Sequence, residues 1–391
     1  MKKEKFSSKI GVIAAVTGAS VGLGNIWKFP YEAGQNGGGI FLITFIICLI
    51  FIGIPILTSV FILGRSTGKT PVGAMKQIKP KSFWYLNGYL GMLGAFLLLA
   101  FYSVVAGWVL EYMIKSIQGT FIHSNIDAIT NEFEKFITDP IAPIIYQFIF
   151  LALTAWIICA GVSKGIEKVS FILMPILLLL ILFLDIYSFT LSGGKAGFKF
   201  LFSFNLIELN FHTLFAAMGQ AFFSLSIGLG AMVIYGSYIE KKVNLIQVSN
   251  EVAITTLVIS MLAGIAIFPA IFAYGISPKA GPSLLFITIP QVFSALQGGS
   301  ILSFFFFLLL ALAGLTSSIS ILEVLVAFFQ QEFKFNRIKS SIVISLLIFI
   351  LTIIYSLSFG ILSNWKILNR SLFENTDILI SNIILPLGGL I

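Results

Sequence analysis

Charged residues are scarce in this chain, and their scarcity excludes a water-soluble globule. Asp, Glu, Lys and Arg together make up 10% of the 391 residues, whereas hydrophobic residues make up 58% and Phe alone occurs 40 times. A soluble domain carries roughly a quarter charged residues, so the polar surface here is too small to cover one. The composition therefore places the chain in lipid.

Cysteine and histidine are also rare. Cys48 and Cys159 both lie within apolar runs, which excludes a disulfide framework and a zinc site. His123 and His212 are too few and too isolated for a metal cluster. The 24 basic residues sit mainly in short segments between apolar runs, which is not the clustering that binds nucleic acid. We expect membrane lipid around the chain and no nucleic-acid partner, and the sequence predicts no oligomeric state.

Long apolar runs fill most of the chain and predict an all-α polytopic membrane protein. A transmembrane helix needs roughly 20 mostly apolar residues. Nine such runs and part of a tenth are present, at residues 10–35, 38–64, 86–115, 141–160, 167–190, 213–239, 248–275, 299–329, 340–359 and 376–391.

The basic residues also predict the orientation of the spans. Most of them fall on the cytoplasmic side if the N-terminus is cytoplasmic, as the positive-inside rule requires. The segment Met1-Lys2-Lys3-Glu4-Lys5 precedes the first run, which has no small-residue cleavage site and is expected to be retained. The sequence thus predicts a multi-pass protein of the inner (plasma) membrane with a cytoplasmic N-terminus.

Two spans contain nearly the same glycine-rich interruption. Ser20-Val21-Gly22-Leu23-Gly24 lies in the first span, and Ser226-Ile227-Gly228-Leu229-Gly230 lies in the sixth. Glycine lowers helix propensity by about 1 kcal/mol relative to Ala, and backbone freed from a helix in lipid must be satisfied by protein, water or ligand. Two broken helices five spans apart are typical of a transporter with its site between two repeats. The alternative is that these glycines only allow close helix packing.

Polar side chains near the two interruptions favour the functional interpretation, because small uncharged oxygen ligands suit a hard monovalent cation. They are Thr17, Ser20 and Asn25 at the first interruption, and Gln220, Ser224 and Ser226 at the second.

A dehydrogenase motif is also matched, but its context is absent. Residues 17–24 fit a glycine-rich nucleotide turn, and Tyr238 and Lys242 have the Tyr-x-x-x-Lys spacing. A dinucleotide fold would require a βαβ unit with an acidic residue about 20 positions on. The run from Ile40 to Leu63 is instead apolar and of membrane length. No enzyme is predicted.

The sequence resembles the neurotransmitter:sodium symporter family, especially its bacterial amino-acid transporters. The motifs that carry the resemblance are residues 18–30, 36–39, 102–108, 161–167, 219–238, 313–318 and 382–389. The resemblance implies a single transporter domain over residues 1–391 with the 5+5 inverted-repeat fold of the leucine transporter (the LeuT-like fold). Repeat one would cover about 10–190 and repeat two about 213–391. The second repeat is expected to be incomplete, because the sequence ends within the tenth span.

The resemblance implies two sodium sites. The second site would be formed by the carbonyls of Gly18, Val21 and Ala313 with the hydroxyls of Thr316 and Ser317. The first site would use the Ser20 carbonyl, Asn25, Ser224, Thr255 and the substrate carboxylate, where the family usually has Asn or Asp in place of Thr255.

The substrate site implied by the resemblance lies at mid-membrane. The substrate carboxylate would meet the N–H groups of Leu23 and Gly24 and the Tyr102 hydroxyl, in keeping with anion binding at helix N-termini. Amine transporters of the family have Asp where this chain has Gly22, so a substrate with its own carboxylate is favoured. The full implied set is Ala19, Ser20, Leu23, Gly24, Leu98, Tyr102, Phe223, Ser224, Ser226, Leu229, Ser317 and Ile321.

Gate residues are implied in the same way. Tyr102 and Phe223 would close the outer side, together with an ion pair between Lys28 and Asp377. On the inner side the family's Arg and Trp correspond to Lys3 and Phe6, and its Asp corresponds to Gln331. Lys3 is therefore expected to pair with Glu332, unless Tyr238 and Ser237 close that side by hydrogen bonds.

Two further questions stay open at the level of the sequence. The tyrosine of the family's chloride site corresponds to Phe45, and the acidic residues of chloride-independent relatives correspond to Thr255 and Ile259, so coupling to chloride or protons is not predicted. Glu323 is an intramembrane acid, which is either functional or a hydrogen-bonded structural carboxylate.

The function implied is sodium-coupled symport of a neutral, hydrophobic amino acid into the cell by alternating access, with two co-transported Na⁺ ions. The alternative is a truncated or non-transporting membrane binding protein that retains the substrate and sodium sites.

Overall fold

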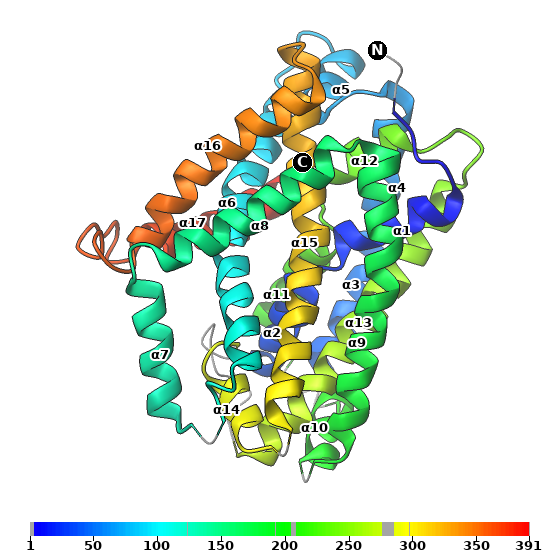
Figure 1. The fold of residues 1–391 in the computed structure, drawn as a ribbon. Coiled ribbons are helices and arrows are strands. Elements are labelled where there is room, and N and C mark those ends of the chain that lie inside the picture. Colours follow the sequence, from blue (N-terminus) through cyan, green and yellow to red (C-terminus); the bar gives the residue numbers. More distant parts are fainter. Residues whose placement is uncertain are drawn as a thin grey trace.

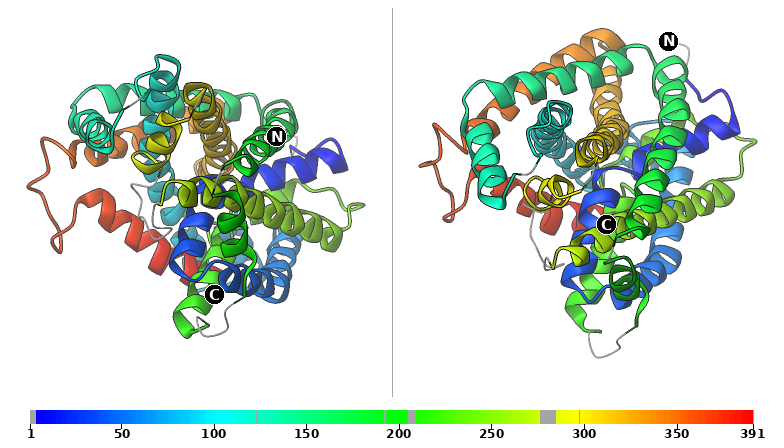
Figure 2. Two further views of the ribbon diagram at one scale, coloured as in Figure 1. Left: turned by 90° about the horizontal axis from the view of Figure 1, so that it is seen from below. Right: turned by 60° about the horizontal axis from the view of Figure 1, so that its bottom comes forward.

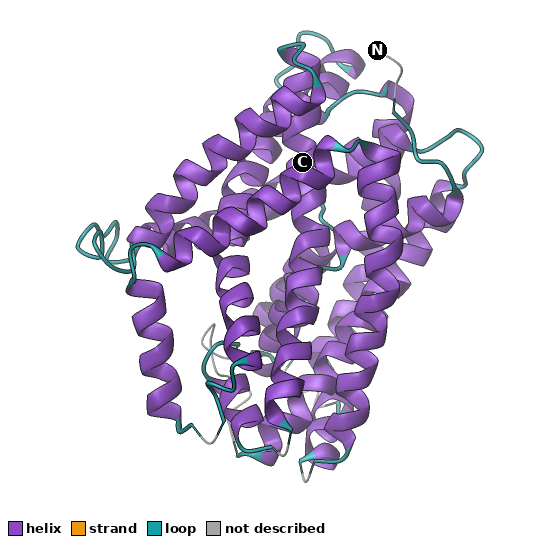
Figure 3. Ribbon diagram, viewed as in Figure 1, coloured by secondary structure: helices purple, strands orange, loops and turns teal. Residues whose placement is uncertain are grey.

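The chain is helical throughout the part that the structure describes. This computed structural model describes residues 4–122, 124–191, 193–204, 209–275, 285–296 and 298–390. Within those residues the only β-type pairing is an isolated bridge between Ile367 and Arg370 (Figure 3). The predicted all-α LeuT-like class is confirmed.

The helices follow one another along the whole chain, and those written η are π-helical. In order they are α1 (Lys9–Ser20), η1 (Gly24–Lys28), α2 (Phe29–Gln35), α3 (Gly39–Cys48), η2 (Leu49–Gly53), α4 (Ile54–Thr67), α5 (Pro71–Ile78), α6 (Tyr85–Ile117), α7 (Ile126–Thr138), α8 (Ala142–Cys159), η3 (Val162–Glu167), α9 (Lys168–Phe189), α10 (Gly194–Phe202), α11 (Phe211–Ser224), α12 (Ala231–Tyr238), α13 (Leu245–Ala273), α14 (Thr288–Ser294), α15 (Gly299–Glu332), α16 (Arg337–Leu357), α17 (Leu372–Leu379), η6 (Ile380–Ile384) and α18 (Leu385–Leu390).

Seven of the described helical segments are long and apolar enough to cross a membrane, and they match seven of the predicted spans. An eighth span is the bent pair formed by α1 with residues 24–35. The sixth predicted span is present as two half-helices, α11 and α12. The tenth predicted span, 376–391, corresponds to α17, η6 and α18, and each of these pieces is short.

Both predicted helix breaks are present, and their backbone geometry explains the need for glycine. Helix α1 ends at Ser20, Val21 is extended with φ −90° and ψ 102°, and the chain bends by 55° before it continues. Between α11 and α12, Gly228 and Gly230 have φ values of 95° and 81°. An L side chain rarely adopts such values, so glycine is required at these two positions.

Helices α6 and α15 form the centre of the molecule. The most apolar windows of α6 and α15 are 78% and 83% buried, whereas those of α8, α9 and α16 are 33–39% buried. Figure 1 shows α15 running the length of the molecule, with α5 and the N-terminus near one end and α7, α10 and α14 near the other. Figure 2 shows α6 and α15 side by side, with α8 and α16 along one edge. The less buried helices are therefore the ones that face lipid.

Candidate functional site

A small cavity lies where the two helix breaks face each other. It has about 310 Å³ of space unoccupied by protein atoms. It is lined by Ala19, Ser20, Gly22, Gly24, Asn25, Leu98, Tyr102, Phe223, Ser226, Leu229, Ser317, Ile321 and Leu385.

Most of the substrate residues predicted from the sequence line this cavity. Two do not. Leu23 borders a different, larger cavity. Ser224 is fully buried, and its hydroxyl donates to the Ala221 carbonyl at 3.2 Å. Gly22, Asn25 and Leu385 line the cavity but were absent from the predicted substrate set.

At the first break, backbone carbonyls that have lost their helical hydrogen bonds are satisfied largely by side chains of other segments. The Ser226 hydroxyl donates to the Ala19 carbonyl at 2.8 Å, and the Gln220 amide donates to the Gly24 carbonyl at 2.9 Å. The Tyr102 hydroxyl pairs with the backbone of Gly24. These contacts join the two breaks and give the cavity a polar end, since buried polar groups in lipid must find partners.

Side chains of the cavity pack closely against the backbone at Gly22 and Gly24. A Cβ atom on Gly22 would lie 2.0 Å from the Ser317 hydroxyl oxygen, and one on Gly24 would lie 2.1 Å from the Phe223 ring. Any side chain at position 22 would therefore collide with Ser317. This geometry agrees with the absence of the Asp that amine transporters carry there.

The predicted residues of the second sodium site converge on Thr316. Its hydroxyl oxygen lies 3.0 Å from the Ala313 carbonyl oxygen and 3.3 Å from that of Val21. A Cβ atom on Gly18 would be 3.5 Å from the Thr316 Cβ, so Gly18 belongs to the same cluster. Hard cations prefer such oxygen ligands, and the donor set of the described residues fits one.

On α13, the structure gives Thr255 and its neighbour Thr256 different environments. The Thr255 hydroxyl donates to the Glu251 carbonyl of its own helix at 2.8 Å, and the residue is only partly buried. Thr256 is fully buried, and its hydroxyl has no hydrogen-bond partner among the residues that the structure describes. The Asn25 amide donates to the Ser260 hydroxyl at 2.9 Å. Because one residue is about 100° around a helix, the inward face carries Thr256 and Ser260 instead of Thr255.

The other members of that set remain near the break. Asn25 and Ser20 are both buried, and the Ser20 hydroxyl has no hydrogen-bond partner. The Asn25 side-chain oxygen accepts from the Gly22 N–H at 3.3 Å.

A second, larger and more open cavity lies beyond Tyr102 and Phe223, which border both cavities. Lys28, Arg370 and Asp377 also line it. The expected ion pair between Lys28 and Asp377 is not formed. The Lys28 ammonium nitrogen lies 4.6 Å from the centre of the Phe223 ring, and Asp377 accepts from the Ser381 hydroxyl. Phe223 therefore replaces Asp377 as the partner of Lys28 in this conformation.

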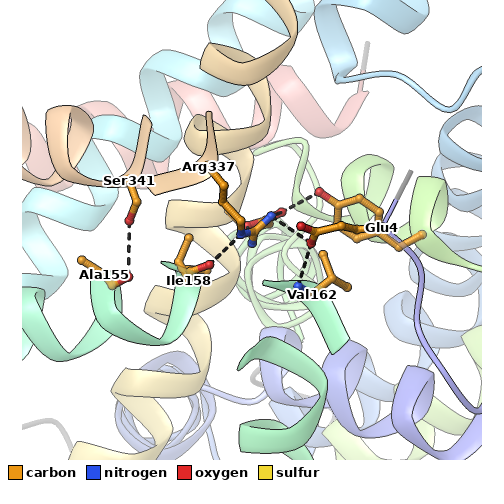
Figure 4. A network of polar contacts seen from close by, with 8 residues as sticks. Glu4, Ala155, Ile158, Val162, Arg337 and Ser341 are labelled. Carbon is orange, nitrogen blue, oxygen red and sulfur yellow. Dashed lines mark hydrogen bonds and ion pairs between the residues drawn. The ribbon is translucent and has the colours of Figure 1, made fainter. Parts of the chain in front are cut away.

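The opposite end of the molecule is closed by a buried polar network (Figure 4). The Tyr238 hydroxyl donates to Glu323 at 2.5 Å, and the Arg337 guanidinium pairs with both oxygens of Glu323. Arg337 also pairs with Glu4 at 3.2 Å. Glu323 is thus a hydrogen-bonded, charge-paired carboxylate, and Tyr238 is joined to it.

This network ties several elements together. The Arg337 Nε donates to the Ile158 carbonyl at 2.6 Å, and Glu4 accepts from the Val162 N–H at 2.7 Å, so α8, η3, α15 and α16 meet here (Figure 4). Phe6 packs edge-on against the rings of Tyr235 and Tyr238.

The pairing expected between Lys3 and Glu332 is not tested by the structure. Lys3 lies outside the described residues. Glu332 pairs with Lys76 at 3.8 Å, and Gln331 accepts from the Thr70 N–H and hydroxyl. The Ser237 hydroxyl donates to the Ile234 carbonyl of its own helix.

A bundle of long apolar helices around two helix breaks, with a polar and apolar cavity between them, defines a membrane transport protein. The comparisons with known proteins agree. The profile of the Sodium:neurotransmitter symporter family matches residues 3–139 and 137–375. The chain belongs to this family.

Two relatives and one solved structure place the chain within the family. The chain is 38% identical to an uncharacterized sodium-dependent transporter of Bacillus subtilis, covering 100% of this chain and 86% of that protein. It is 34% identical to an uncharacterized sodium-dependent transporter of Haemophilus influenzae, covering 100% and 88%. Its fold is similar to the crystal structure of MhsT in complex with L-phenylalanine, with a TM-score of 0.91, 41% identity and coverage of 99% and 88%.

Proposed function

We propose that this protein is a sodium-coupled symporter that carries a neutral, hydrophobic amino acid into the cell by alternating access. The single observation that supports this most is the composition of the cavity between the breaks. Its polar end carries Gly24, Asn25 and Tyr102, whereas its other lining includes Leu98 and Ile321. An unpaired substrate charge beside those aliphatic side chains would cost several kcal/mol, which favours a neutral side chain.

In this proposal the substrate carboxylate meets the backbone at Leu23 and Gly24 and the Tyr102 hydroxyl. The shared position of Tyr102 and Gly24 in the cavity lining supports it, because both groups are then within reach of one substrate. The amino group meets carbonyls at the breaks, including that of Ala19. MhsT was solved with L-phenylalanine, a neutral hydrophobic amino acid, which adds support for this substrate class.

Two Na⁺ ions are proposed as co-substrates. One is held by Gly18, Val21, Ala313, Thr316 and Ser317. The other is held by Ser20, Asn25 and Ser224, with Thr256 taking the place first given to Thr255. One charge that crosses 100 mV contributes about 2.3 kcal/mol, so two ions moving inward drive substantial accumulation.

We further propose that residues 1–391 form one transporter domain, with repeat one at about 10–190 and repeat two at about 213–391, and that the N-terminus is cytoplasmic. Tyr102, Phe223, Lys28 and Asp377 then act on the extracellular side. Tyr238, with Glu323 and Arg337, closes the cytoplasmic side, and Lys3 is proposed as a further gate residue.

Uptake of labelled amino acids into proteoliposomes that contain the 391-residue chain tests this proposal. Uptake should require an inward sodium gradient and should stop when potassium or choline replaces sodium. Uptake that is the same in potassium would overturn sodium coupling. Saturable binding without accumulation would support the alternative, a membrane binding protein.

The sodium role has its own test in Thr316. Replacement of Thr316 and Ser317 by Ala should abolish sodium-dependent uptake, because the Thr316 hydroxyl beside the Ala313 and Val21 carbonyls is lost together with the proposed Ser317 ligand. Thr255→Ala is a matched control, since Thr255 is only partly buried and does not line the cavity between the breaks.

A further inference from the structure

The tenth span reaches the central cavity through one side chain, Leu385. This residue lines the cavity between the breaks and is only 3% exposed. It is the first residue of α18 and follows directly on the π-helical turn η6. A π-helical turn is a widened turn that often occurs at functional positions. Leu385 therefore enters the cavity from an element that neither the sodium sets nor the predicted substrate set includes.

The backbone holds α18 tightly against the break between α11 and α12. A Cβ atom on Gly228 would lie 2.9 Å from the Leu385 carbonyl oxygen, and one on Gly388 would lie 2.6 Å from the Gly228 carbonyl oxygen. Only glycine permits so close an approach of two backbones. The position of Leu385 is thus set by backbone packing against the broken helix.

The neighbouring side chains make this part of the cavity wall apolar. A Cβ atom on Gly94 would lie 2.6 Å from the Ile384 side chain and 3.2 Å from the Leu229 side chain. Helix α6, the second break and the tenth span therefore meet at Gly94. Leu98, one turn further along α6, lines the same cavity as Leu229 and Leu385.

We propose that Leu385 forms an end wall of the amino-acid site and sets the largest side chain that the site accepts. The inference rests on the proposed function, since it concerns the selectivity of that same cavity. Because backbone contacts fix Leu385 in place, it cannot move aside for a larger substrate. The size of the Leu385 side chain therefore decides how long a substrate side chain the cavity can hold. Loss of three carbon atoms at this position should admit bulkier side chains.

The test measures selectivity and not the amount of activity. Sodium-dependent uptake of leucine and of tryptophan is measured in the same proteoliposomes, and the ratio of their kcat/KM values is compared between variants. This ratio does not depend on how much of the protein is active. The variants are Leu385→Ala, the milder Leu385→Val, and Leu385→Phe. The control is Leu387→Ala on the same helix, because Leu387 is 44% exposed and does not line the cavity.

Leu385→Ala should raise the tryptophan-to-leucine ratio by about tenfold or more, since a single methylene in a hydrophobic pocket already changes selectivity about 10–200-fold. Leu385→Val should raise the ratio less, Leu385→Phe should lower it, and Leu387→Ala should leave it unchanged. If the wild-type protein shows uptake but the ratio is unchanged in the Ala and Val variants, the proposed role of Leu385 is wrong and the proposed function still stands. An equal change in the Leu387 control would also overturn the role of Leu385. A wild-type protein without sodium-dependent uptake of either amino acid would overturn the proposed function itself.

Discussion

At the scale of single residues, two adjacent threonines on α13 differ in what their hydroxyls do. The Thr255 hydroxyl is bonded to its own helix, and the Thr256 hydroxyl is buried without a partner. A buried hydroxyl without a hydrogen-bond partner costs roughly 1–3 kcal/mol. A ligand that contacts this hydroxyl would remove the cost and would therefore bind more tightly. Thr256 is therefore the better candidate for a sodium contact.

Thr256→Ala should weaken the sodium dependence of uptake, whereas Thr255→Ala should leave it close to wild type. Loss of one oxygen contact to a bound cation is expected to raise the sodium concentration at half-maximal uptake several-fold. Sodium titration of amino-acid uptake at a fixed membrane potential measures this. The assignment would be wrong if Thr255→Ala shifted the titration and Thr256→Ala did not.

Two glycines in the two broken spans allow a similar comparison. A Cβ atom on Gly22 would lie 2.0 Å from the Ser317 oxygen, whereas one on Gly219 in α11 meets nothing within 4 Å. Gly22→Ala should abolish substrate binding, because Ser317 would have to move into the cavity. Gly219→Ala should retain binding and stabilise the protein by about 0.4–1 kcal/mol, through the lower entropy of the unfolded chain. Equilibrium binding and thermal unfolding in detergent measure the two effects.

At the scale of elements, the sequence predicted the breaks well because glycine and polar residues interrupt apolar runs within a few positions of one another. Gly22, Gly24, Gly228 and Gly230 mark both breaks by composition alone. The face of α13 could not be found in this way, since its apolar residues surround the helix and leave no stripe to fix its rotation. Which face of α13 turns inward depends on its contact with Asn25, which lies far away in sequence.

The partner of Glu323 also could not be predicted from the local sequence pattern. Arg337 lies 14 positions further on, past the turn between α15 and α16, and the two meet only because that turn folds back. The sequence identified Glu323 as an intramembrane acid. The residue that pairs with its charge could be identified only from the folded structure. Glu4 and the Ile158 carbonyl complete the arrangement from two further elements.

Removal of Arg337 should be more damaging than removal of the whole pair. Arg337→Met leaves the fully buried Glu323 carboxylate without its cation and should cost about 3–5 kcal/mol, whereas Glu323→Gln combined with Arg337→Met should recover most of that loss. Thermal unfolding of the single and double variants in detergent tests the difference. A double variant as unstable as Arg337→Met would show that the guanidinium contributes through the Ile158 and Glu4 contacts instead.

At the scale of the whole molecule, the two ends differ in access to the central cavity. On one side the larger, more open cavity meets the central cavity at Tyr102 and Phe223. On the other side Phe6, Tyr238, Glu323 and Arg337 are packed with little or no exposed surface. The two helix breaks followed from the sequence, but this asymmetry did not, because composition does not distinguish one conformation of a transporter from another.

Alternating access makes an opposed prediction for two reporter positions. Ile378 lines the large cavity, and Phe6 is 3% exposed at the opposite end. In a variant with Cys48 and Cys159 replaced by Ala, Ile378→Cys should react quickly with a maleimide in sodium, and Phe6→Cys should be protected. Replacement of sodium by potassium should slow the first reaction and speed the second, because an ion that binds one conformation more tightly shifts the population towards it. Rapid labelling of both positions under one condition would mean that the two ends open independently, which is incompatible with coupled transport.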